Sequence, residues 1–134
     1  MEKLVWKLRI SILWIFLAVA MSAAMILYIM GPGVIEDIIS GEMENMEISA
    51  GILMIFALFW LIPLIMSFLT LILKDTANRY VNAILGLFFG VFYIVDISGH
   101  MSRGEEFGGH ALVGVAGIIV AFLIFWHAWK WPKK

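Results

Sequence analysis

The sequence predicts an all-α membrane protein: a four-helix transmembrane bundle, up-down-up-down, with a short interfacial helix in the first outer loop. The 134 residues are 63% hydrophobic and only 14% charged, whereas a soluble domain is nearer half apolar and a quarter charged. The apolar residues are also gathered into four runs, each long enough for a helix to cross a hydrocarbon core about 30 Å thick. This composition excludes a soluble enzyme, a nucleic-acid-binding protein and a disordered chain.

Each of the four runs is a predicted membrane span. They cover approximately residues 10–30, 48–73, 81–97 and 111–129. The second run is long enough to cross with tilt, and together they predict a single transmembrane domain over residues 1–134. The start of the chain also resembles a secretory signal, because basic residues precede the apolar run and Ala18-Val19-Ala20 follow its first part. The run continues to Met30, which favours a retained helix.

Charged residues are distributed unequally between the predicted loops. Eight basic residues fall in the two termini and the second loop: Lys3, Lys7, Arg9, Lys74, Arg79, Lys130, Lys133 and Lys134. Only Arg103 falls on the other side, which carries most of the acidic residues: Glu36, Asp37, Glu42, Glu44, Glu47, Asp96, Glu105 and Glu106. Short cytoplasmic loops collect Lys and Arg. The sequence therefore predicts a multi-pass protein of the cell membrane whose N- and C-termini are both cytoplasmic.

The first outer loop is too long for a bare turn. Residues 31–33 (Gly-Pro-Gly) end the first span, and residues 34–39 then place apolar side chains at helical spacing with Glu36 and Asp37 on the opposite face. This pattern predicts a short amphipathic helix at the outer interface, ended by Gly41.

Small residues predict which spans pack together. Gly86 and Gly90 form a small-xxx-small step in the third span, with Asn82 on the same face, and Gly114 and Gly117 form a similar stripe in the fourth. Lipid supplies no hydrophobic drive for helices to associate, so close backbone approach must supply it. We expect these two helices to form a tight antiparallel hairpin, an interpretation that we prefer to a ligand groove.

The predicted spans contain almost no ionisable side chain. A proton- or cation-coupled transporter needs one at depth, and Asp96 lies at the outer end of its span. A small oligomeric transporter or channel is therefore an alternative that requires a continuous polar path through Ser67, Thr70 and Asn82. Pro63 is expected to put a fixed bend into the second span.

Chemically versatile side chains gather at the outer ends of the third and fourth spans. The candidate metal ligands there are His100, His110, Asp96 and Glu106. Imidazole and carboxylate groups suit zinc, iron or copper, but the spacing matches no compact metal motif. Pairing of Asp96 with His100 one turn later, or with Arg103, is the preferred interpretation. A metal- or haem-dependent membrane enzyme is a further alternative.

No catalytic constellation is recognisable. The chain has no cysteine, which excludes thiol chemistry, and it shows no Ser-His-Asp order, HExxH or Gly-rich phosphate loop. We therefore assign no catalytic residue and no cofactor, and favour a protein that is not an enzyme. The leading hypothesis is an interaction or binding bundle for a lipid or small apolar ligand, with the bilayer and a second copy of the chain as partners and no nucleic acid.

Three short segments carry a family resemblance: residues 13–16 (LWIF), 76–83 (TANRYVNA) and 126–131 (WHAWKW). They resemble a family of small, uncharacterised prokaryotic four-helix membrane proteins, a domain of unknown function grouped loosely with DoxX-like proteins. The resemblance implies a compact four-helix unit of unknown activity and supplies no catalytic residue. In its most distinctive segment we predict a cytoplasmic anchor, with Arg79 at anionic headgroups and Asn78 and Asn82 joining helix ends.

Overall fold

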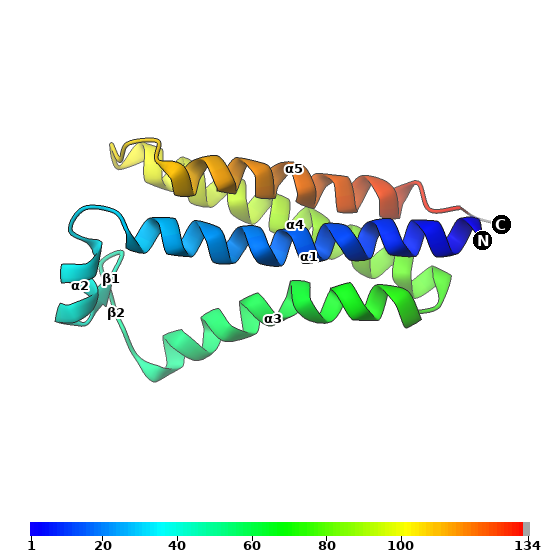
Figure 1. Ribbon diagram of the computed structural model, residues 1–134, viewed down its shortest axis with the longest axis horizontal. Helices are drawn as coiled ribbons and strands as arrows, with labels where there is room; N and C mark the ends of the chain where they lie inside the picture. Colours follow the sequence, from blue (N-terminus) through cyan, green and yellow to red (C-terminus); the bar gives the residue numbers. More distant parts are fainter. Residues whose placement is uncertain (133–134) are drawn as a thin grey trace.

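Four long helices dominate the computed structural model, which describes residues 1–132 (Figure 1). They are α1 (Glu2–Ile29), α3 (Ala50–Ile72), α4 (Asp75–Ser102) and α5 (Gly109–Trp129), and each is long and apolar enough to cross a membrane. Successive helices run in opposite directions, so that α1 begins and α5 ends at the same end of the bundle. The predicted helical bundle is confirmed. Two of the basic residues counted above, Lys133 and Lys134, lie outside the described residues.

The helices extend beyond the predicted spans. Helix α1 begins at Glu2 and α4 runs from Asp75 to Ser102, whereas the apolar runs gave starts near residues 10 and 81. An apolar run marks only the part of a helix that suits hydrocarbon. The backbone hydrogen bonds of a helix continue through the polar residues that flank this part.

The segment between α1 and α3 forms a compact cap at one end of the bundle. Helix α2 (Val34–Ser40) ends at Gly41, whose φ of 92° is left-handed, as expected for a glycine that terminates a helix. A two-stranded antiparallel hairpin follows, β1 (Glu42–Met43) and β2 (Met46–Glu47). The hairpin was not predicted, because strands of two residues are too short to show an alternating pattern.

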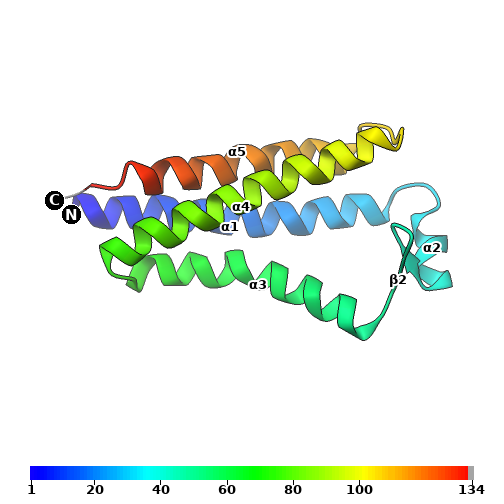
Figure 2. The same ribbon diagram turned by 180° about the vertical axis from the view of Figure 1, so that it is seen from behind.

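Helix α3 bends near its middle, and its first half diverges from the other helices toward the capped end (Figure 2). Pro63 lies inside this helix and is buried. Proline lacks the N–H that would bond to the preceding turn, which accounts for a bend here. As a result α3 packs mainly on α1 and contacts α4 only slightly.

Helices α4 and α5 make the most extensive contact in the bundle. A Cβ atom placed on Gly86 would lie 2.8 Å from the backbone N of Phe125 and 3.0 Å from the backbone O of Ala121. The side chains of the partner helix would lie 3.0, 3.0 and 3.2 Å from a Cβ on Gly90, Gly114 and Gly117. The glycines of the two small stripes thus face the partner helix at close range.

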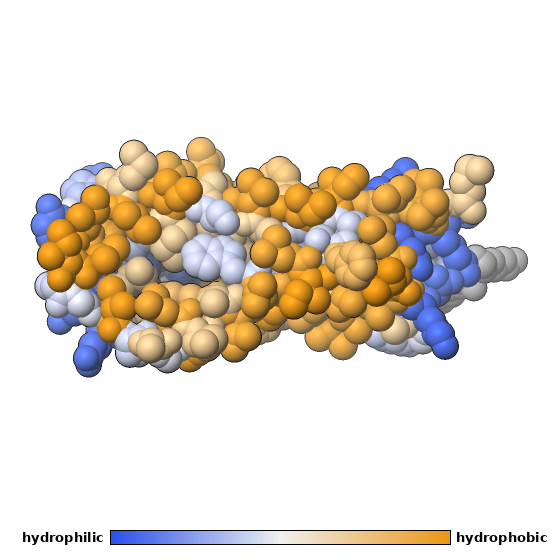
Figure 3. Space-filling view, turned by 60° about the horizontal axis from the view of Figure 1, so that its bottom comes forward, coloured by the Kyte–Doolittle hydropathy of each residue, from blue (hydrophilic) through white to orange (hydrophobic). Residues whose placement is uncertain are grey.

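The core lies between α1, α4 and α5. Its fully buried apolar side chains are Ile10, Trp14, Leu17, Phe89, Ala121, Ile124 and Ala128. The outward-facing side chains form an apolar band, and hydrophilic residues gather at both ends (Figure 3). This distribution suits a molecule whose middle faces lipid and whose ends face water.

Candidate functional site

A cavity of about 380 Å³ lies between the four long helices and the hairpin, in the half of the bundle near α2. On the face drawn in Figure 3 the surface is hollowed toward the end that carries α2. Six aromatic side chains line the cavity: Tyr28 of α1, Phe56, Phe59 and Trp60 of α3, and Phe92 and Tyr93 of α4. The divergence of the part of α3 that precedes Pro63 leaves the space that these rings surround.

The aromatic walls are in contact with one another where α3 still meets α4. The ring centroid of Phe59 lies 4.6 Å from that of Phe92 and 4.9 Å from that of Phe89. Aromatic pairs at such distances add stability beyond the area that they bury. This cluster joins the aromatic walls to the buried core of the bundle.

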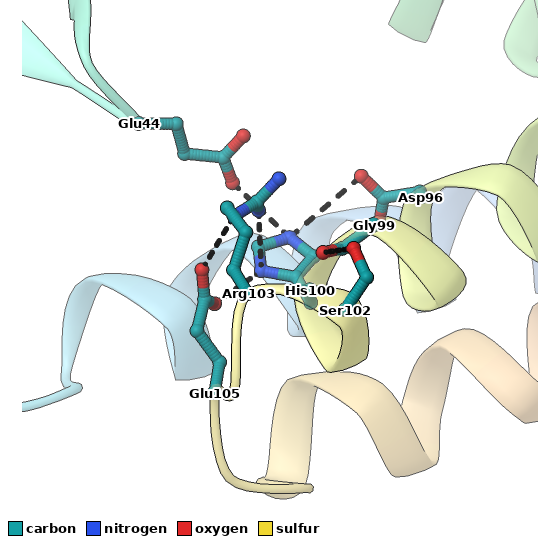
Figure 4. A network of polar contacts seen from close by, with 7 residues as sticks. All are labelled: Glu44, Asp96, Gly99, His100, Ser102, Arg103 and Glu105. Atoms are coloured by element: carbon teal, nitrogen blue, oxygen red, sulfur yellow. Dashed lines mark hydrogen bonds and ion pairs between the residues drawn. The ribbon is translucent and has the colours of Figure 1, made fainter.

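The opposite end of the cavity is polar and is organised around His100, which is only 6% exposed. Its Nε2 lies 3.3 Å from Oε1 of Glu44 and 3.8 Å from Oδ1 of Asp96 (Figure 4). Its Nδ1 contacts the carboxylate of Glu105 and lies 3.1 Å from Nη2 of Arg103. Asp96 and His100 are therefore paired one turn apart, and Glu44 and Glu105 approach the same ring from two other segments.

An ion pair in the loop between α4 and α5 lies next to His100. Nε of Arg103 donates to Oε1 of Glu105 at 2.8 Å. The contacts from His100, and then from Arg103, hold the pKa of Glu105 below its ordinary value. The hydrogen bond to Glu105 correspondingly raises the pKa of Arg103. Because Nδ1 of His100 faces a carboxylate and a guanidinium together, it can donate to the first or accept from the second, but not both.

The hairpin places Glu44 at an unfavourable backbone conformation. Glu44 and Asn45 form its turn with φ values of 52° and 62°, as in the two-residue turns that suit the twist of a hairpin. Asparagine tolerates this region, but for glutamate it costs on the order of 1 kcal/mol. In return the carboxylate of Glu44 reaches His100, which belongs to a different part of the chain.

The candidate metal ligands are not gathered around one point. His100, His110 and Asp96 line the same cavity, and the two imidazole rings lie 5.4 Å apart between centroids. Glu106 instead lines a second cavity, of about 550 Å³, in the outer loops. Within residues 1–132 no group of three or more His, Asp or Glu side chains is arranged to hold a metal ion. The Nε2 of His110 is buried and has no hydrogen-bond partner within the same residues.

Asn78 and Asn82 belong to a buried polar network away from the cavity. Nε1 of Trp14 donates to Oδ1 of Asn82 at 2.6 Å, and Oγ1 of Thr70 donates to the same atom at 3.2 Å. Nδ2 of Asn82 donates to both oxygens of Asn78, at 2.6 and 2.7 Å. Nδ2 of Asn78 donates to the backbone O of Thr70 at 2.6 Å. The two asparagines thus connect α4 to α1 and to the end of α3.

Ser67, Thr70 and Asn82, the polar residues through which a transport path would run, are hydrogen-bonded to other protein groups. Thr70 and Asn82 are fully buried and bond to each other, and the hydroxyl of Ser67 donates to the backbone O of Leu64 in its own helix. Trp14 and Phe89 pack edge to face in the bundle centre, 5.8 Å apart. Two bulky side chains, Trp14 and Phe89, therefore occupy the bundle centre next to Asn82.

Arg79 lies at the end of the bundle opposite the cavity. Its guanidinium is 5.8 Å from the ring centroids of both Tyr80 and Trp129, a cation–π arrangement. Nζ of Lys130 lies 4.4 Å from the ring centroid of Trp126. Basic and aromatic side chains therefore occur together at this end, which is typical of a membrane interface.

Sequence reasoning missed the cavity, although two of its walls carry a readable signal. Asp96 follows Tyr93 by three residues and His100 follows Asp96 by four, while Phe59 and Trp60 follow Phe56 by three and four residues. Residues at these spacings share one face of a helix. An aromatic face on the second span opposite an aromatic and ionisable face on the third would have pointed to this site.

The chain was also compared with known proteins. No curated protein and no solved structure is significantly similar to it. One family model matches residues 3–133. This match agrees with the resemblance to an uncharacterised family, but a likeness to DoxX proteins is not shown. The chain belongs to the Family of unknown function (DUF6326).

Proposed function

We propose that this membrane protein binds a small amphipathic molecule or lipid in the cavity between α1, α3, α4 and α5, without chemical conversion. The observation that carries the proposal is the cavity itself, which is apolar and aromatic over most of its wall and polar at one end. Its volume of about 380 Å³ falls in the usual range for ligand sites, roughly 300–1,000 Å³. A few polar groups at one end of an apolar site orient a ligand.

The position of the cavity favours an amphipathic ligand. The walls that carry Phe56, Phe59 and Phe92 belong to the middle of the bundle, which suits an apolar tail. The polar end is next to the hairpin and the loop after α4, where water and headgroups are expected. The buried hydrogen bond between Thr70 and Asn82 favours this function over the transporter or channel.

A matched series of amphiphiles tests the proposal. Three 12-bromododecyl compounds that carry a trimethylammonium, an alcohol or a sulfate head are titrated into the protein in dodecyl maltoside micelles. Bromine quenches an indole that it contacts, and Trp60 lines the cavity. We expect at least one compound to produce saturable quenching that is lost in Trp60→Phe.

Variants that fill the cavity or leave it unchanged provide the control. Ala24 lines the cavity, so that Ala24→Phe places a ring inside it and is expected to abolish saturable quenching. Ala57→Phe adds the same ring to an exposed position on α3 outside the lining and is expected to change nothing. Binding by none of the three compounds, or equal binding by wild type and Ala24→Phe, would rule the site out.

We also propose that both termini are cytoplasmic in the cell membrane. The basic residues Lys3, Lys7 and Arg79 lie at the same end of the bundle, opposite α2 and the hairpin, as the bias of short cytoplasmic loops requires. Because the chain has no cysteine, single cysteines report sidedness directly. A membrane-impermeant maleimide applied to intact cells is expected to label Glu47→Cys, and to label Glu2→Cys only after permeabilisation. The reverse pattern would invert the orientation.

A further inference from the structure

The polar end of the cavity carries an excess of negative charge. Two carboxylates, those of Glu44 and Asp96, line the cavity, and no lysine or arginine is among its lining residues. Around His100 there are three carboxylates, because Glu105 contacts its other ring nitrogen. Arg103 is paired with Glu105. Even a protonated His100 therefore leaves one of these carboxylates without a matching cation.

The two lining carboxylates converge although they come from separate segments. Glu44 is held by the hairpin turn and Asp96 by α4, and both lie within 3.8 Å of the same nitrogen of His100. Their side chains are 34% and 43% exposed, so that they are accessible to a ligand. A carboxylate has about four acceptor positions, and a contact with one imidazole leaves most of them available.

The aromatic walls point to the same class of ligand. Tyr28 and Tyr93 line the cavity near its polar end: the ring centroid of Tyr28 lies 6.3 Å from that of His100, and Tyr93 precedes Asp96 by three residues on α4. The face of an aromatic ring is electrically negative and attracts a cation, and several rings around one site are the usual means of binding a quaternary ammonium group. An anionic head would be repelled by the carboxylates and by the negative faces of the rings.

We propose that the ligand is an amphiphile with a cationic head, an amine or quaternary ammonium, held between Glu44, Asp96 and the aromatic rings. This inference rests on the proposed function and names the chemistry of its ligand. The tail lies along the apolar wall, and the head neutralises the excess negative charge beside His100.

The three bromododecyl compounds separate this inference from the proposed function, because they share a tail and differ only in the head. We expect the trimethylammonium compound to bind about tenfold more tightly than the alcohol, and the sulfate to bind most weakly. Dodecyl maltoside is uncharged, so that micelle charge does not bias the comparison.

Isosteric variants assign the preference to the two carboxylates. Asp96→Asn and Glu44→Gln are each expected to lower the affinity for the cation by a larger factor than the affinity for the alcohol, so that the preference for the cation shrinks while the alcohol still binds saturably. That second measurement also shows that each variant is folded. Glu42→Gln, in the neighbouring strand and outside the cavity lining, is expected to match the wild type.

The outcomes are distinct. Equal affinity for the cation and the alcohol in the wild type would overturn the cationic head and leave an amphiphile site in place. Tightest binding of the sulfate would overturn it as well, and would assign the head to His100 and Arg103. Failure of all three compounds to quench Trp60 would instead remove the proposed function. A preference for the cation that survives in Asp96→Asn and Glu44→Gln alike would contradict the assigned residues.

Discussion

Replacement of Asn82 by alanine is expected to lower the free energy of unfolding by about 1–3 kcal/mol. The Asn82 amide takes part in four hydrogen bonds, with Trp14, with Thr70 and with two oxygens of Asn78. All four residues are fully buried. No water is available inside the bundle to replace the lost partner, so that the indole N–H of Trp14 is left without an acceptor, whereas the Thr70 hydroxyl keeps its 2.7 Å bond to the backbone O of Met66.

Unfolding by SDS in mixed micelles, followed by circular dichroism, measures this effect. Ser22→Ala is the matched control, because its hydroxyl bonds only to Ala18 of its own helix, at 3.1 Å, and the residue is exposed. The control is expected to unfold at the wild-type SDS concentration. An Asn82→Ala variant that did the same would show that the network adds nothing to stability.

A double-mutant cycle with Trp14→Phe sharpens the test. Phenylalanine keeps an aromatic ring next to Phe89 but removes the N–H that donates to Asn82. Because both single changes break the same bond, the double variant should be destabilised by less than the two single effects together. Strict additivity would mean that the 2.6 Å contact carries no coupling.

The buried network also marks how far the sequence predicts this fold. Apolar run length indicates a span because it is a local property, and all four spans were predicted. Trp14 and Asn82 are 68 residues apart. No local sequence pattern predicts that the indole in the first span contacts the amide in the third. Asn82 was expected to pack against the fourth span and to join helix ends together with Asn78, but nothing in the sequence predicted Trp14 as its partner.

Of the contacts at the polar end of the cavity, only the one between Asp96 and His100, both in α4, was predicted. The spacing of Asp96 and His100 is a helical turn, and the structure pairs them at 3.8 Å. Glu44 was missed because its approach depends on a hairpin with a glutamate at positive φ, where a turn predicted from sequence would carry Gly or Asn. Such a conformation is held by the surrounding contacts rather than by the residue itself.

The direction of the bend in α3 could not be predicted from the sequence either. Pro63 predicts a bend, but the direction of the bend depends on what the helix packs against. Here the first half of α3 diverges from α4 and leaves a cavity. A bend in the opposite direction would have closed the aromatic face of Phe56 and Trp60 against its neighbours.

Replacement of Gly86 by alanine is expected to destabilise the protein, whereas the same replacement stabilises most helices. Glycine to alanine normally stabilises a helix by about 0.5–1 kcal/mol. At Gly86 the new Cβ would lie 2.8 Å from the backbone N of Phe125 and 3.0 Å from the backbone O of Ala121. Backbone atoms cannot rotate aside, so that α4 and α5 must separate. We expect Gly86→Ala to be destabilised by about 1–3 kcal/mol, as in other overpacked cores.

Two further glycines calibrate this result in the same SDS assay. At Gly51 in α3 a Cβ would meet only the hydroxyl of Ser49, at 3.8 Å, and Gly51→Ala is expected to be at least as stable as the wild type. At Gly90 the contact is with the ring of Phe122, at 3.0 Å, which can turn away, so Gly90→Ala should fall between them. If Gly86→Ala proved as stable as Gly51→Ala, the close approach of α4 and α5 would be refuted. A backbone atom of α5 that lies 2.8 Å from the Cβ position of Gly86 leaves no space for a methyl group.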